Sequence, residues 1–119
     1  MDSRQRDPAE CLPLTPALFH VLLSLVDGQK HGYAILKEVA ERSDGSVALS
    51  TGTLYGIIKR LLADGWIAEA RTRRAADDDE RRRYYRLTAL GGTVARAEAA
   101  RLTKLVKMAR AVGFAPGRA

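Results

Sequence analysis

The chain of 119 residues has very little cysteine: Cys11 is its single one, so no disulfide can form within it. Long hydrophobic runs are also missing, because no stretch approaches the roughly eighteen consecutive apolar residues of a membrane span. The N-terminal residues Met1 to Pro8 are mostly polar and lack the apolar core of a secretory signal. These absences predict a protein of the reducing cytoplasm, with no membrane partner.

Aromatic residues make up 6% of the chain, which disfavours recognition of single-stranded RNA by base stacking. The two histidines, His20 and His31, form no recognised metal-ligand spacing with Cys11. Gly52 and Gly56 are not followed by the Gly-Lys-Ser/Thr of a phosphate-binding Walker loop. We therefore expect a protein that is not an enzyme, with no metal and no cofactor.

Positive charge is what the chain has in excess. Its formal net charge is +6, which favours an anionic partner such as nucleic acid. The arginines gather in two groups, Arg71–Arg74 and Arg81–Arg83, on either side of the acidic run Asp77–Glu80. This distribution indicates a patterned surface segment and not a basic tail.

Three helices are predicted in the first half of the chain. The first, over residues 15–26, starts with a Thr-Pro pair typical of helix starts and is apolar nearly all round, so it should be buried on several sides. The second spans about residues 31–42, with Tyr33, Leu36, Val39 and Ala40 at helical spacing. The third begins at a Ser or Thr cap and continues through residue 64, and the glycine that follows stops it. Its apolar stripe consists of Leu54, Ile58 and Leu61.

Two strands follow, at residues 66–72 and 82–87, where side chains alternate as they do in a sheet. The charged loop between them has no Gly or Asn for a tight turn, so we expect it to be long and mobile. Three helices followed by a two-stranded hairpin is the winged-helix arrangement. The predicted fold class is therefore mainly α with a small β-hairpin: a winged helix-turn-helix domain plus a long C-terminal dimerisation helix.

That last helix should begin at the cap Thr88 and extend from about residue 89 to 112. Its apolar residues recur at heptad spacing, interrupted by Glu98. Since so small a domain cannot cover the whole stripe, a second copy of the chain is the expected partner. The residues predicted to hold the homodimer are Leu102, Leu105, Ala109 and Val112. The predicted organisation is a flexible arm over 1–13, the winged domain over 14–88, the dimerisation helix over 89–113 and a tail over 114–119.

In a helix-turn-helix the second helix of the motif enters the major groove of DNA with its N-terminal half. Here that helix begins with small hydroxyl residues and two glycines, which allow close approach to phosphates. Tyr55 could contact a thymine methyl or a phosphate, and Lys59 fits a phosphate. Arginines of the hairpin would add phosphate or minor-groove contacts, or would instead pair with the acidic run. The candidate DNA-binding residues are Ser50, Thr51, Thr53, Tyr55, Lys59, Arg71, Arg73, Arg74, Arg81, Arg82 and Arg83.

Several spaced motifs, in this order, resemble those of PadR-type transcriptional regulators. They are His31–Ile35, Gly52–Tyr55, Lys59–Leu62, Asp64–Ile67 and Arg83–Thr88. The resemblance covers nearly the whole chain, from about residue 14 into the C-terminal helix, and the short length resembles the compact branch of the family. It implies a winged-helix domain and a dimer built by the C-terminal helix with help from the first.

The resemblance also implies repression of transcription at a pseudo-palindromic duplex operator, often relieved by a small molecule. It adds Tyr33 to the DNA contacts, and Leu18 and Leu22 of the first helix to the dimer contacts. The acidic loop tip departs from the family and disfavours deep insertion into the minor groove. The last helix has no aromatic residue before Phe114, which disfavours a site that stacks an aromatic ligand. The rival hypothesis is a winged-helix module that binds proteins instead of DNA.

Overall fold

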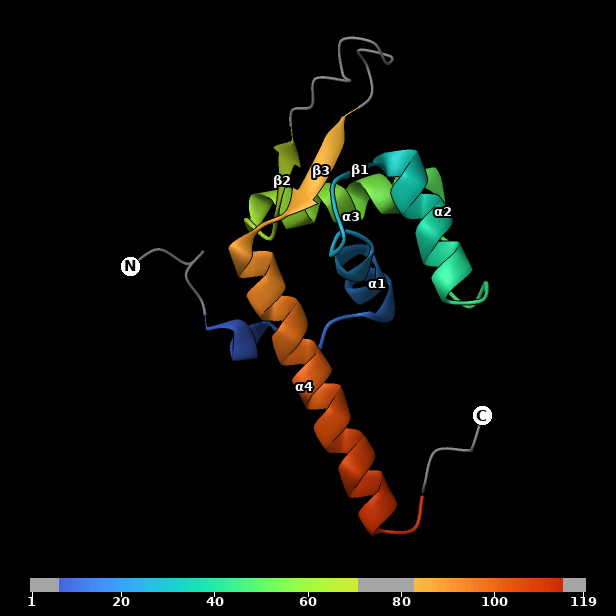
Figure 1. Ribbon diagram of the computed structural model, residues 1–119, viewed down its shortest axis with the longest axis vertical. Coiled ribbons are helices and arrows are strands. Elements are labelled where there is room, and N and C mark those ends of the chain that lie inside the picture. The colour runs from blue at the N-terminus through green and yellow to red at the C-terminus, as the bar shows by residue number, and fades with distance from the viewer. Residues whose placement is uncertain (1–6, 71–82, 115–119) are drawn as a thin grey trace.

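The computed structural model describes residues 7–70 and 83–114, drawn as coloured ribbons in Figure 1. Its elements are a short 3-10 helix Pro8–Cys11, α1 Pro16–Ser24, β1 Lys30–His31, α2 Gly32–Arg42, α3 Thr51–Ala63, β2 Ile67–Ala70, β3 Tyr84–Leu87 and α4 Ala89–Ala111. The order confirms the expected winged-helix arrangement with a long C-terminal helix. In this described part of the chain, no helix is both long and apolar enough to cross a lipid bilayer.

Hydroxyl side chains start three of the helices, as predicted. The Oγ atoms of Thr15, Ser50 and Thr88 accept backbone N–H groups of α1, α3 and α4 at 3.2, 3.1 and 3.0 Å. Helix α2 starts differently, because Nδ1 of His31 accepts the N–H of Ala34 at 3.2 Å. These caps satisfy N–H groups that have no partner inside a helix, so they fix where each helix begins.

The described strands form an antiparallel sheet in the order β1-β3-β2. In the hairpin, Ile67 lies opposite Leu87 and Ala70 lies opposite Tyr84. The additional strand β1 pairs with β3 and was not predicted, because two residues are too few to show an alternating pattern. The loop expected to be mobile, about residues 75–80, lies outside the described residues.

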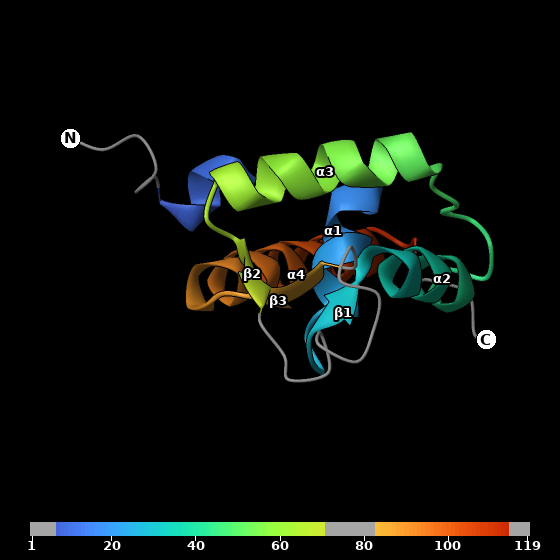
Figure 2. The same ribbon diagram turned by 90° about the horizontal axis from the view of Figure 1, so that it is seen from above.

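The core is built around α1, as its apolar character predicted. Val21 and Leu22 have no exposed surface, and α1 packs against both α2 and α4. Figure 2 shows α3 extending along one side of the domain, where its stripe Leu54, Ile58 and Leu61 is buried as expected. The predicted apolar side of α2 was partly wrong: Ile35 and Val39 are buried, whereas Tyr33 is exposed.

Helix α4 has two different halves. Its first turns pack on the domain through Gly91, Val94 and Ala95, and its second half projects away from the other helices (Figure 1). A Cβ added at Gly91 would overlap the backbone carbonyl oxygen of Trp66, so glycine is required there for close approach. Gly91, a residue that weakens the helix by its propensity, therefore allows α4 to approach the segment that follows α3.

The segment before α1 corrects one prediction. Residues 1–13 were expected to be a flexible arm, but Pro8–Cys11 forms a 3-10 helix that packs on α4. Cys11 and Leu12 are partly buried, and the backbone N–H of Leu14 donates to a carboxylate oxygen of Glu98 at 3.3 Å. The apolar side chains between the two prolines hold this segment against the domain. Residues 1–6 lie outside the described part.

Candidate nucleic-acid interface

The N-terminal end of α3 is exposed and is capped by the side chain of Ser50. The Ser50 hydroxyl accepts the N–H of Thr53 at 3.1 Å and donates to the Thr53 Oγ1 at 2.9 Å. Ser50 therefore serves the cap, while Thr53 keeps its own hydroxyl proton for an outside acceptor. Because the first N–H groups of a helix have no partner within it, the start of α3 also favours an anion such as a phosphate.

One face of α3 is open from its first turn to its third. A Cβ added at Gly52 or at Gly56 would meet no atom within 4 Å, so the backbone is uncovered at both positions. Tyr55 and Lys59 share this face at helical spacing and are exposed, as is Thr51 at the start of the helix. The structure thus brings together the predicted site residues of this helix.

Tyr33 stands beside that face, at the first turn of α2, and is 70% exposed. The ring of His31 is roughly parallel to the Tyr33 ring, with centroids 6.5 Å apart, and meets Tyr84 edge-on at 5.4 Å. This contact ties the start of α2 to strand β3. His31 therefore caps α2, and its ring lies alongside that of Tyr33.

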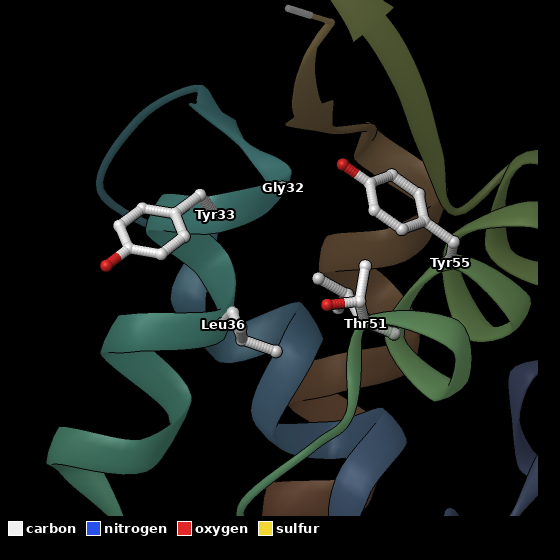
Figure 3. A pocket seen from close by; sticks show the side chains of 6 residues that line it. Gly32, Tyr33, Leu36, Thr51 and Tyr55 are labelled. Carbon is white, nitrogen blue, oxygen red and sulfur yellow. The ribbon is translucent and has the colours of Figure 1, made fainter.

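Tyr55 closes the space between the two helices of the motif. Its phenol ring lies over Gly32, where an added Cβ would come within 2.9 Å of the Tyr55 Cζ and overlap its hydroxyl. Tyr33 and Tyr55 flank a pocket of about 80 Å³ whose lining surface is mostly apolar (Figure 3). The pocket is lined by Gly32, Tyr33, Leu36, Thr51, Leu54 and Tyr55. It could not be predicted from the sequence, because its lining residues come from two separate helices.

The hairpin contributes one described candidate. Arg83 is exposed and forms an ion pair with Glu69 of the neighbouring strand at 3.4 Å. Such an exposed pair contributes little to stability, so the guanidinium can exchange its carboxylate for a phosphate at small cost. Arg86, also exposed on β3, was not singled out from the sequence. The remaining predicted arginines lie outside the described residues: Arg71, Arg73, Arg74, Arg81 and Arg82.

The predicted dimer contacts divide into two groups. Leu102, Leu105 and Val112 are exposed on the projecting half of α4 (Leu105 is 46% exposed), and Ala109 is partly exposed. Leu18 and Leu22 were also predicted to contact the partner, but they are only 4% and 0% exposed within the single chain. Their side chains fill the core of the domain and have no surface left for a partner. In the described ranges, no group of three or more His, Cys, Asp or Glu residues could hold a metal ion.

Comparisons with known proteins agree with this geometry. A family model described as the transcriptional regulator PadR-like family matches residues 21–97. A comparison with curated proteins gives no match. Among solved structures, a PadR family transcription regulator from Clostridium difficile superposes with a TM-score of 0.67 at 25% identity, over 81% of this chain and 96% of that one.

Two further structures are similar. A PadR family transcriptional regulator from Eggerthella lenta has a TM-score of 0.60 at 26% identity, over 77% of this chain and 79% of that one. A transcriptional regulator from Clostridium thermocellum has a TM-score of 0.66 at 24% identity, over 79% of this chain and 86% of that one. With the family model spanning more than half of the sequence, this chain belongs to the transcriptional regulator PadR-like family.

Proposed function

We propose that this protein is a cytoplasmic, homodimeric repressor that binds a pseudo-palindromic duplex operator. Each protomer places the N-terminal half of α3 in the major groove, and the hairpin contacts the flanking backbone. The observation that carries the proposal is the open face of α3, where Tyr55 and Lys59 are exposed next to an uncovered helix backbone. In a helix-turn-helix, the N-terminal residues of the second helix of the motif are the part that contacts base edges.

The residues of that face suit two kinds of DNA contact, one to base edges and one to phosphates. Thr51, Thr53 and Tyr55 offer hydroxyl and aromatic groups suited to base edges, whereas Lys59 offers a charge suited to a phosphate. Arg83 adds a second cation on the hairpin. Base contacts distinguish sequences and phosphate contacts bind all sequences about equally, so the two groups of residues predict different mutant phenotypes.

The projecting half of α4 supports the homodimer. Leu102, Leu105, Val106 and Met108 are large apolar residues exposed there. Burying a leucine side chain fully contributes about 1.5–3 kcal/mol, so leaving several in water is costly. The cation Lys107 lies on the opposite side of the helix by its periodicity. A second copy that packs its own α4 on the apolar stripe would cover it and leave this charge in solvent.

The test is selection of binding sites from a random duplex library, followed by titration of a selected and a scrambled duplex over a salt series. Tyr55→Ala should lose about 1–3 kcal/mol more on the selected site than on the scrambled one. Lys59→Ala should weaken both by a similar factor and lower the slope of log affinity against log salt by about one per half-site. Lys107→Ala, which removes a charge from the far side of α4, is the control and should leave that slope unchanged.

A library that yields no preferred duplex would refute sequence-specific binding and favour the protein-interaction module. If Lys59→Ala were the sequence-selective variant and Tyr55→Ala the uniform one, the division of roles would be reversed. No effector is included in the proposal, because the pocket between α2 and α3 lies on the face assigned to DNA. Release by a small molecule is implied by family resemblance alone.

A further inference from the structure

The pocket between α2 and α3 is an apolar feature on a surface otherwise suited to polar and charged groups. Leu36 and Leu54 form its floor and side, the ring of Tyr55 stands on one side, and Tyr33 borders the other side with its ring directed outward (Figure 3). Leu54 is buried in the core, so the floor is fixed, while Thr51 and both tyrosines are exposed at the rim. A DNA duplex seated on α3 would close this pocket.

The size of the pocket restricts its occupant. Sites for drug-sized molecules have volumes of about 300–1,000 Å³, whereas this pocket has about 80 Å³. It has room for one small group and not for a ring system. Of the groups on base edges in the major groove, the C5-methyl of thymine is the apolar one; the others are hydrogen-bond donors and acceptors.

We propose that this pocket receives the C5-methyl group of one thymine in each half-site, and that it makes the protein select thymine at that position. Thr51 lies at the rim and brings a hydroxyl that can donate to O4, the atom next to the methyl on the thymine edge. The inference rests on the proposed function, since it specifies what the reading face of α3 recognises. It also gives Tyr55 a role, because its ring lies over Gly32 beside the pocket and would exclude water from the methyl.

The test replaces each thymine of the selected site in turn with uracil, which removes the methyl and keeps every hydrogen-bonding group. Transfer of one methyl from water into an apolar site corresponds to about fourfold in affinity. We expect one symmetry-related position at which uracil weakens binding about fourfold in one half-site and about sixteenfold in both. 5-Bromouracil at that position should restore the affinity, because bromine is close to a methyl in size and is apolar.

Two protein variants connect this effect to the pocket. Leu36→Phe places a larger side chain in the pocket and so reduces the free space. It should remove the difference in affinity between thymine and uracil. Leu36→Met keeps a similar volume and should retain that difference. Circular dichroism of both variants shows whether the fold is intact, and scrambled duplex shows whether phosphate binding is retained.

The outcomes separate this inference from the function on which it rests. A uracil penalty that disappears in Leu36→Phe and persists in Leu36→Met supports the pocket assignment. A site-specific protein with no uracil penalty at any position overturns it, and so does a penalty that Leu36→Phe leaves unchanged. Failure to select any duplex sequence would instead refute the proposed function.

Discussion

Gly91 and Gly92 are adjacent in sequence and have opposite requirements. At Gly91 a methyl group would overlap the carbonyl oxygen of Trp66, which is backbone and cannot move aside cheaply. At Gly92 the nearest atom would be a flexible Arg96 nitrogen at 3.6 Å, an ordinary contact. Substituting alanine at each position therefore measures two different effects: the cost of overpacking at Gly91 and the low helix propensity of glycine at Gly92.

We expect Gly91→Ala to lower the free energy of unfolding by about 3 kcal/mol, at the upper end of the range for overpacking. Gly92→Ala should raise it by up to about 1 kcal/mol, because alanine favours the helix. Urea unfolding followed by circular dichroism measures both. Equal effects of the two substitutions would show that the contact with Trp66 relaxes.

Glu98 is a buried carboxylate that the sequence showed only as a break in the heptad pattern. The Arg101 guanidinium donates to both of its oxygens, at 2.6 and 2.9 Å, and the Leu14 N–H donates to one of them. Hydrogen bonding by Arg101 is the main reason that the pKa of Glu98 lies below its ordinary value. The folded state thus favours the charged form, so this contribution to stability is present above the ordinary glutamate pKa.

Acid should remove the Glu98 contribution, as the pH falls from about 4.3 through the lowered pKa of the folded state. Glu98→Gln should lower the free energy of unfolding at neutral pH by about 1–3 kcal/mol and flatten its dependence on pH in the acid range. The matched control is Glu41→Gln on the exposed side of α2, which should behave like the wild type. Parallel acid curves for Glu98→Gln and the wild type would contradict this account.

The two halves of helix α4 have different surroundings. Its first half belongs to the core of its own domain, and its second half exposes Leu102 and Leu105. Because those two side chains contribute little to the fold of the single chain, changing them should separate assembly from folding.

Replacing both Leu102 and Leu105 with glutamate should give a folded monomer. Light scattering measures the mass, and circular dichroism checks that the helix content is retained. Lys107→Glu, on the opposite side of the helix, should remain dimeric and controls for the added charge. A wild-type protein that is monomeric at micromolar concentration would contradict the dimer, and an unfolded double variant would show that the projecting half supports the domain.

The sequence predicted the helices well because their signals are local: hydroxyl caps at Thr15, Ser50 and Thr88, and apolar residues three and four apart. It missed features made by residues distant in the chain. Strand β1 exists through pairing with β3, and the requirement for Gly91 comes from a carbonyl on another element. The same holds for the site: the exposed residues of α3 could be predicted from one helix, whereas the pocket needs Leu36 of α2 as well.

In the proposed assembly, two copies on one duplex would set the spacing of the two α3 helices. Half-sites bound by such dimers lie about one helical turn, or 10–10.5 base pairs, apart. Inserting about five base pairs between the selected half-sites turns one of them to the opposite side of the duplex. Affinity should then fall to the level of a single half-site, measured by fluorescence anisotropy. Unchanged affinity would indicate that the copies bind independently.

The start of α4 is hydrogen-bonded to the residues that directly follow α3, and this has a mechanical consequence. The Thr88 hydroxyl donates to the Gly65 carbonyl oxygen at 2.6 Å, and the Thr88 backbone N–H donates to the Trp66 carbonyl oxygen at 3.1 Å. Gly91 lies against the carbonyl oxygen of Trp66. These contacts hold the end of α3 and the start of α4 together. In the proposed dimer, a small change in the angle at which the two copies of α4 cross becomes a change in the distance between the two α3 helices. The long helix would act as a lever arm, converting a rotation at the dimer contact into a mismatch with the pitch of DNA.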